Sequence, residues 1–179
     1  MIKNIAIYCS SSNEISDTYK RAAEELGFLL GKKRIHIING AGNRGLMQVV
    51  SEAALSTGGT VTGVIPTFMM ERNWHHEKLT KLIEVSSMHE RKKTIVDLSD
   101  AAIALPGGYG TLEELLEIIT WRQLGIRNNP VIILNTNGFY DSLITMFHRA
   151  YDEKFIPSGG LSLWELADTP EEILKKLKI

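Results

Sequence analysis

The chain has 179 residues, of which 44% are hydrophobic, so it is long enough to bury one substantial core. Its 20 basic and 21 acidic residues give a formal net charge of -1, which argues against capture of nucleic acid or an anionic membrane by bulk charge. A single cysteine excludes an internal disulfide, and no apolar run reaches the roughly 18 residues of a spanning helix. We expect a single domain over residues 1–179, soluble and cytoplasmic, with no nucleic-acid or membrane partner.

Short apolar runs alternate with amphipathic segments along the chain. The run IAIY (5–8) precedes apolar residues at helical spacing over 19–30, which is the pattern of a strand followed by a helix. The same pattern recurs with IHII before 45–55, TVTGVI (60–65), LIEV before a helix after 88, AAIAL before 111–124, VIIL before 139–151, and WELA before a helix started by Thr169 and Pro170. Strands and helices in this alternation predict an α/β fold, a Rossmann-like doubly wound parallel sheet with helices on both faces.

The pattern fails between Pro66 and Leu82, where TFMMERNWHHEKLT (67–80) fits neither period. We expect an irregular or partly helical excursion that covers a site. Its adjacent His75 and His76 have a poor geometry for ligating one metal ion, so we predict no metal site.

Four strand-to-helix loops form the candidate site, because ligands of open parallel sheets bind beyond the carboxyl ends of the strands. Glycine turns bring backbone N–H groups close to a ligand, and a helix N-terminus adds partial positive charge. Arg91, Lys92 and Lys93 fall in the first turns of a helix, where the macrodipole disfavours cations by about 0.3–1 kcal/mol each. A bound anion would offset this cost, so we predict a site for a nucleotide monophosphate. The loops are CSSSN (9–13), NGAGNRGLM (39–47), SSMHERKK (86–93) and PGGYGTLEE (106–114).

These motifs also have simpler interpretations. GAGNRG (40–45) matches the dinucleotide fingerprint, but it lies in the second strand–helix unit and no acid follows to hold a ribose, which disfavours an NAD enzyme. Its glycines are also typical of a close helix-to-sheet crossing. Thr111 and Glu114 have the spacing of a capping box, as have Ser87 and Glu90, so a capping role for Glu114 stays open. A solvated basic face is the alternative for the two lysines.

PGGYGTLEE resembles the P-G-G-x-G-T-x-x-E signature of the LOG ("lonely guy") family, the cytokinin riboside 5'-monophosphate phosphoribohydrolases, whose members are often mislabelled lysine decarboxylases. SMHERK (87–92) and NGAGNRGLM resemble the other two motifs of the family, although Ala41 and Gln48 replace common glycines. The resemblance implies a homodimer that hydrolyses the N-glycosidic bond of N6-modified adenosine monophosphates, and often of AMP, with no redox cofactor. It implies that Arg91 and Glu114 are catalytic. The substrate-binding candidates are Lys92, Gly107, Gly108, Tyr109, Gly110, Thr111, Leu112, Glu113 and Thr120, with Ser11 and Gly42 from the first two loops.

The charges of these residues suit the reaction. Breaking an N-glycosidic bond develops positive charge on the sugar and negative charge on the leaving base. We therefore predict that Glu114 stabilises the sugar or orients water, that Arg91 offsets the charge on the base, and that Gly107–Thr111 anchors the 5'-phosphate. Relatives often carry a glutamate near the excursion, and Glu71 and Glu77 compete for that role.

Two other classes stay open: a carrier that binds a nucleotide or phosphorylated cofactor without turnover, and a pyridoxal-phosphate decarboxylase. The second needs a lysine placed for a Schiff base, and no context in the sequence singles one out. The predicted helix 111–124 is apolar on more than one face, so we expect part of it to meet a second subunit. Its apolar residues are Leu112, Leu115, Leu116, Ile118, Ile119 and Trp121.

Overall fold

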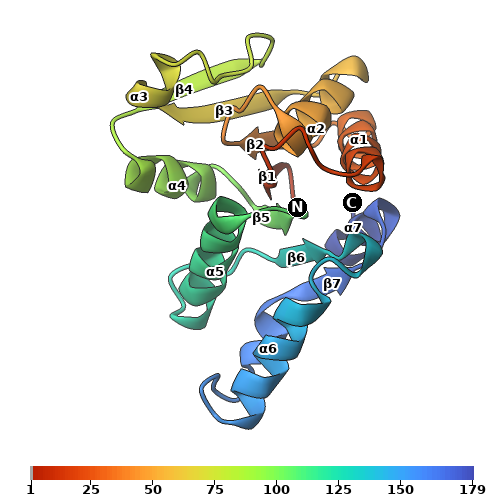
Figure 1. Ribbon diagram of the computed structural model, residues 1–179, viewed down its shortest axis with the longest axis vertical. Helices are drawn as coiled ribbons and strands as arrows, with labels where there is room; N and C mark the ends of the chain where they lie inside the picture. Colours follow the sequence, from red (N-terminus) through yellow and green to blue (C-terminus); the bar gives the residue numbers. More distant parts are fainter. Residues whose placement is uncertain (1) are drawn as a thin grey trace.

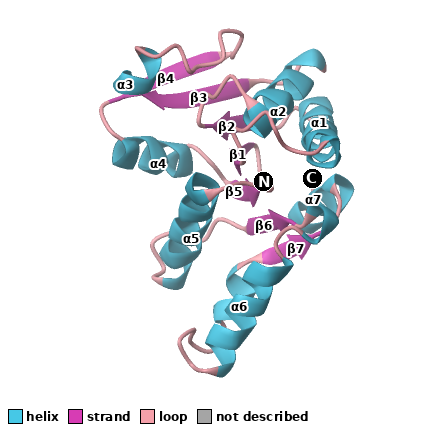
Figure 2. Cartoon of the chain, viewed as in Figure 1, coloured by secondary structure: helices cyan, strands magenta, loops and turns pink. Residues whose placement is uncertain are grey.

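One seven-stranded sheet organises the chain in the computed structural model, which describes residues 2–179 (Figures 1 and 2). All paired strands are parallel, and their order is β4-β3-β2-β1-β5-β6-β7. The order runs outward in both directions from the neighbours β1 and β5, which confirms the doubly wound prediction. The strands are β1 (Asn4–Tyr8), β2 (His36–Asn39), β3 (Val61–Pro66), β4 (Lys81–Val85), β5 (Ala101–Ala104), β6 (Val131–Leu134) and β7 (Glu165–Ala167).

Helices cover both faces of this sheet, with α1, α2 and α7 on one face and α4, α5 and α6 on the other (Figure 1). Short 3-10 turns cover Thr136–Gly138 and Gly160–Leu163. None of the described helices is long and apolar enough to cross a membrane. The helices are α1 (Asp17–Lys32), α2 (Gly45–Ser56), α3 (Thr67–Met70), α4 (Met88–Asp97), α5 (Tyr109–Gln123), α6 (Asp141–Asp152) and α7 (Pro170–Leu177).

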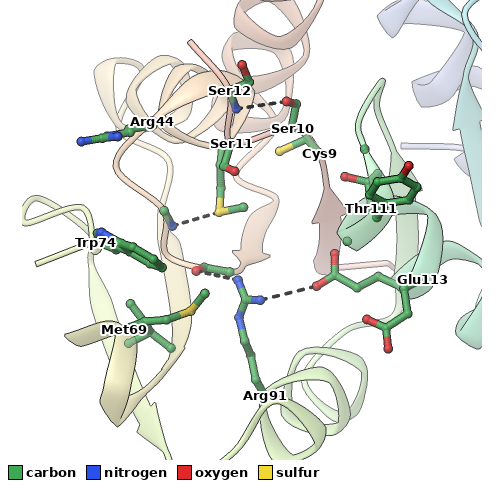
Figure 3. Close-up of a pocket in the computed structure, with 18 of the residues that line it drawn as sticks. Cys9, Ser10, Ser11, Ser12, Arg44, Met69, Trp74, Arg91, Thr111 and Glu113 are labelled. Carbon is green, nitrogen blue, oxygen red and sulfur yellow. Dashed lines mark hydrogen bonds and ion pairs between the residues drawn. The ribbon is translucent and has the colours of Figure 1, made fainter. Parts of the chain in front are cut away.

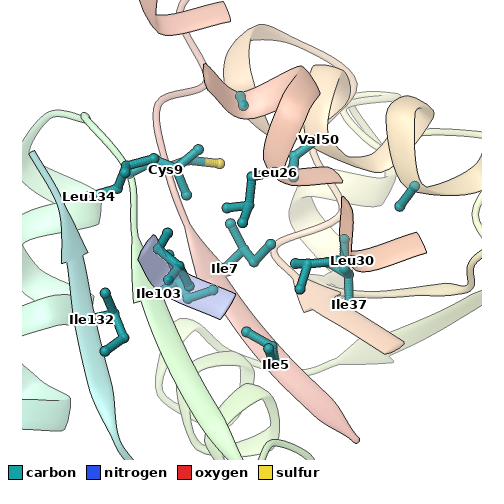
Figure 4. Packing of buried hydrophobic residues seen from close by; sticks show 14 of the residues in the cluster. Ile5, Ile7, Cys9, Leu26, Leu30, Ile37, Val50, Ile103, Ile132 and Leu134 are labelled. Atoms are coloured by element: carbon teal, nitrogen blue, oxygen red, sulfur yellow. The ribbon is translucent and has the colours of Figure 1, made fainter. Parts of the chain in front are cut away.

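The core consists of two hydrophobic clusters, one on each face of the sheet. Successive residues of β1 show the division, because Ile5 and Ile7 face α1 and α2 (Figure 4), whereas Ala6 and Tyr8 belong to the cluster of the opposite layer. Central strands are buried on both faces, which explains why they read in the sequence as continuous apolar runs.

Two helix starts follow the capping signals. In α7, Thr169 Oγ1 accepts a hydrogen bond from the Glu172 amide, and the helix begins at Pro170. In α4, Ser87 accepts from the Glu90 amide. The Glu90 carboxylate accepts from the amide of Ser86 rather than from that of Ser87, so this capping box is offset by one residue.

The predicted start of α5 is wrong. The helix begins at Tyr109 rather than at 111, and its N-cap is Gly108, which has no side chain to make a capping bond. Thr111 is therefore the third residue of the helix, and the capping-box interpretation of Thr111 and Glu114 fails. The Glu114 carboxylate is left with no capping role at this helix terminus.

The excursion after β3 is partly helical, as predicted, and folds back onto the loop that follows β2. Its helix α3 is followed by a turn and by an isolated antiparallel bridge between Gly42 and His75. The amide of Asn43 donates to Trp74 O at 3.2 Å, and the amide of His76 donates to Ala41 O at 2.8 Å. These bonds hold the excursion over the carboxyl end of β2.

Candidate active site

A cavity of about 610 Å³ opens at the carboxyl ends of the central strands (Figure 3). All four loops singled out in the sequence contribute residues to its wall, because the carboxyl ends of parallel strands meet at one edge of the sheet. The excursion closes one side with Met69 and Trp74. The four predicted loops thus meet around one cavity, and its role as the site stays a prediction.

Arg91 projects from α4 into this cavity and is held in a fixed orientation (Figure 3). Its Nε donates to Val64 O at 3.0 Å and its Nη2 to Gly40 O at 2.9 Å, while only 8% of the residue is exposed. Its Nη1 lies 3.8 Å from Glu114 Oε1. Nε and Nη2 of the guanidinium therefore donate to backbone carbonyls, whereas Nη1 faces Glu114 and the cavity.

Gly40 explains part of the glycine-rich loop after β2. A Cβ built on Gly40 would lie closer than 3.0 Å to Nη2 of Arg91, a separation that real Cβ atoms do not show. This glycine thus makes room for the arginine, which comes from 51 residues further along the chain. The fingerprint match at GAGNRG reflects this packing and offers no support for dinucleotide binding.

Glu114 is the buried carboxylate of the site. It projects from α5 with 13% of its side chain exposed and faces Arg91. Burial raises the pKa of this carboxyl to about 7, and the neighbouring Arg91 opposes the rise. Glu114 therefore changes its charge near neutral pH, the range in which a carboxylate serves best as a general base.

Lys92 does not line the cavity, contrary to the position expected of a substrate contact. Its Nζ lies 2.6 Å from Glu113 Oε1 and 3.2 Å from Glu117 Oε1. The hydrogen bond to Glu113 raises the pKa of the ammonium. The two carboxylates of α5 therefore offset the free-energy cost of placing this cation near the start of α4. The sequence had suggested that a bound anion would offset this cost. Lys93 is exposed and pairs with Asp97, as a solvated face predicts.

Two of the helix N-termini at the cavity, those of α2 and α5, differ in what they can bind. At α2, the amide of Gly45 donates to Asn13 Oδ1 at 2.8 Å and that of Leu46 donates to Ser10 O at 2.9 Å, so protein groups already occupy these donors. At α5, no described residue accepts from the amides of residues 109–111, and a Cβ on Gly108 or Gly110 would meet no atom within 4 Å. The open donors of α5 are therefore available to bind an anion.

Most of the predicted site residues meet here, but three besides Lys92 do not line the cavity. Gly107 lies beside it, where a Cβ would overlap the Thr111 side chain. Leu112 packs against the core cluster of its face, and Thr120 lies exposed further along α5 with its hydroxyl donating to Leu116 O. Their proposed contacts with substrate stay predictions. The predicted residues that line the cavity are Arg91, Glu114, Ser11, Gly42, Gly108, Tyr109, Gly110, Thr111 and Glu113.

The cavity has an apolar wall opposite α5, and the sequence did not indicate which residues form it. Met69 and Trp74 come from the excursion, which the sequence marked as a cover without a periodicity that would show which side chains point inward. Neither Glu71 nor Glu77 lines the cavity, so the role for which they compete stays a prediction. The rest of this wall comes from Met47, Ile65 and Met88.

Comparisons with known proteins find relatives over nearly the whole chain. Residues 47–177 match the family described as "Possible lysine decarboxylase". A probable cytokinin riboside 5'-monophosphate phosphoribohydrolase of Oryza sativa subsp. japonica is 44% identical over 176 residues, which cover 98% of this chain and 70% of the relative. A cytokinin riboside 5'-monophosphate phosphoribohydrolase of Arabidopsis thaliana is also 44% identical, over 98% of this chain and 83% of the relative.

Solved structures show the same fold at low sequence identity. The molybdenum cofactor binding protein of Rippkaea orientalis has a TM-score of 0.76 at 22% identity, covering 99% of this chain and 96% of that one. The molybdenum cofactor carrier protein of Chlamydomonas reinhardtii has a TM-score of 0.72 at 18% identity, covering 99% and 97%. At such identities the likeness extends to the fold alone.

Proposed function

The chain belongs to the LOG family of cytokinin riboside 5'-monophosphate phosphoribohydrolases, and we propose that it hydrolyses the N-glycosidic bond of adenosine 5'-monophosphates, N6-modified ones included. The products are the free base and ribose 5-phosphate. One observation carries this proposal beyond the family: a buried carboxylate, Glu114, faces a fixed guanidinium, Arg91, beside an open helix N-terminus.

The geometry supports a place for each part of the substrate. The 5'-phosphate binds the free amides of residues 109–111, and Glu114 follows one turn later on the same helix, at the height of the ribose. The base lies toward Arg91 and the apolar wall of Met69 and Trp74. Remote binding of the phosphate then orients the bond that breaks.

The charges act on opposite sides of that bond. As the C1'–N bond breaks, its electron pair leaves with the base, and Nη1 of Arg91 offsets the developing negative charge. The Glu114 carboxylate stabilises the positive sugar and accepts a proton from the water that adds to C1', while the departing base takes up a proton from solvent and so leaves as the neutral free base. This role requires ionised Glu114, so activity should fall as the pH drops through about 7.

A pyridoxal-phosphate decarboxylase does not fit the residues present. Such an enzyme needs a lysine amine in the cavity for a Schiff base, and no lysine among residues 2–179 lines it. The nearby Lys92 is held by two carboxylates, which favour its charged, non-nucleophilic form.

A carrier without turnover also fits poorly. Placing the buried Glu114 beside a site for an anionic ligand costs free energy in binding, and a carrier would gain nothing from that cost. A carboxylate opposite an arginine is instead what a transition state with separated charges requires.

The proposal includes a homodimer in a reducing, cytoplasmic setting. Leu116 and Thr120 of α5 and its C-cap residue Leu124 follow one another at four-residue spacing and are exposed, with Leu124 64% exposed. A second subunit would cover this apolar strip and bring Thr120 against the substrate of its partner. The buried thiol of Cys9 fits a reducing compartment.

Release of free base from a substrate panel tests the function. We expect release from AMP and from N6-isopentenyl-AMP, and far less from GMP and CMP. Stable nucleotide binding without release of base from any of the four would favour the carrier, and preferred turnover of CMP would contradict the assignment of the base site.

A further inference from the structure

A cluster of charges links α4 to α5 directly behind the catalytic pair. Lys92 follows Arg91 in the sequence, and its side chain is only 7% exposed, yet it does not line the cavity. It reaches α5 at Glu113 and Glu117, at 2.6 and 3.2 Å, while Arg91 reaches the same helix at Glu114. Two neighbouring cations of α4 thus form ion pairs with three carboxylates that lie within little more than one turn of α5.

We propose that Lys92 is a positioning residue that acts through Glu113 and Glu117 to keep Glu114 ionised and turned toward Arg91, rather than a residue that binds the substrate. This inference rests on the proposed function, because it concerns the carboxylate to which that function assigns catalysis. Its geometric basis is the pair of short contacts that Lys92 makes with these two carboxylates, of which Glu113 lines the cavity and Glu117 does not.

The balance of charges around Glu114 makes its ionisation depend on Lys92. Without Lys92, three carboxylates would share one cation, Arg91, two of whose sides already donate to backbone carbonyls. Glu113 and Glu117 are more exposed, at 59% and 27% of their side chains, so water stabilises their charges better than that of Glu114. Glu114 would therefore be the carboxylate that takes up a proton.

Groups from other elements do not replace this cation. The titratable groups that interact with Glu114 come from the end of β1 as well as from α4 and α5. Tyr8 and Cys9 are buried, and burial raises the pKa of both, so each stays neutral over the working pH range. Among residues 2–179 these groups are Arg91 and Lys92 of α4, Glu113 and Glu117 of α5, and Tyr8 and Cys9, while Arg44 lines the same cavity from the start of α2.

A positioning role and a substrate-binding role predict different kinetics. A lysine that binds the 5'-phosphate contributes to the preference for AMP over adenosine, so its loss should erode that preference. A lysine that keeps Glu114 ionised acts on both substrates equally, and its loss should change the pH dependence instead.

The experiment compares Lys92→Met, which keeps the length and removes the charge, with Lys92→Met/Glu117→Gln, which restores the net charge of the cluster. For Lys92→Met we expect the acid limb of kcat/KM for AMP to move to higher pH, with about a tenfold loss at pH 6 and a much smaller loss at pH 9. The double variant should return the limb toward that of the wild type, and the AMP to adenosine ratio should stay within about threefold throughout. A collapsed ratio with an unmoved limb would overturn the proposal.

Glu117→Gln alone keeps the test valid should Lys92→Met not fold. Removing a negative charge near Glu114 should move the acid limb to lower pH, and an unmoved limb would count against the proposal. Titration of the Glu114 side chain by 13C NMR in the free protein gives the same comparison without substrate. It therefore separates failure of this assignment from failure of the proposed function: a Glu114 midpoint that is unchanged in both Lys92→Met and Glu117→Gln would refute the role of Lys92 whatever the enzyme hydrolyses.

Discussion

Gly40→Ala should disable the enzyme while leaving it folded. The new Cβ would overlap the guanidinium of Arg91, which is the far end of a flexible side chain and can turn away. Turning away breaks the bond to Gly40 O at 2.9 Å and strains the bond to Val64 O at 3.0 Å. A hydrogen bond to a charged group contributes about 1.5–3 kcal/mol, and the cavity lets water recover part of that loss, so we expect a cost of about 1–3 kcal/mol in unfolding free energy.

The activity should suffer far more than the stability. Loss of one oriented group that stabilises transition-state charge costs about 10²–10³ in kcat, so Gly40→Ala should lose at least about 100-fold. Thermal unfolding followed by circular dichroism and release of adenine from AMP measure the two effects. Gly110→Ala is the matched comparison, because its Cβ meets no protein atom within 4 Å and should instead raise KM for AMP by crowding the phosphate. A Gly40→Ala protein with kcat near that of the wild type would refute the role given to Arg91.

Three further predictions address the buried carboxylate, the phosphate and the assembly. The folded pKa of Glu114 is about 7 against an ordinary 4.5, so the stability it contributes is present below pH 4.5 and lost as the pH rises through 7. Denaturant titrations should therefore show Glu114→Gln gaining up to about 3 kcal/mol on the wild type between pH 4.5 and 8, and a pH-independent difference would contradict the raised pKa. Adenosine should be a far poorer substrate than AMP, and comparable kcat/KM values would remove the phosphate from the end of α5. Leu124→Glu should turn a dimer into a monomer in light scattering, whereas a wild-type monomer at micromolar concentration would contradict the dimer.

The strands of the sheet could be predicted because short stretches of the sequence are enough to identify them. Each central strand is a continuous apolar run, since both faces of the sheet are covered, and α7 begins with a capping pattern contained within four residues. The start of α5 could not be predicted in the same way. Gly108 caps without a side chain, and the Thr111–Glu114 spacing imitates a capping box whose N-cap would lie three residues later.

The site was predictable as a set of loops but not as a set of contacts. Gly40 admits Arg91 across 51 residues, and Lys92 meets Glu113 across 21, so no local pattern records either pair. Trp74 was missed for a different reason, because the excursion has no period from which an inward direction follows. These contacts follow instead from the strand order and from the position of α4 beside α5, neither of which can be read from a local stretch of sequence.

The products formed from AMP by the wild type and by Glu114→Gln test the central claim most directly. Glutamine keeps the size of the side chain and removes its charge, so both proteins should fold and bind the nucleotide. We predict that the wild type releases adenine and ribose 5-phosphate in equal amounts over many turnovers, and that Glu114→Gln releases both at least about 100-fold more slowly. Recovery of intact AMP from the wild type, or equal rates for the two proteins, would contradict the account.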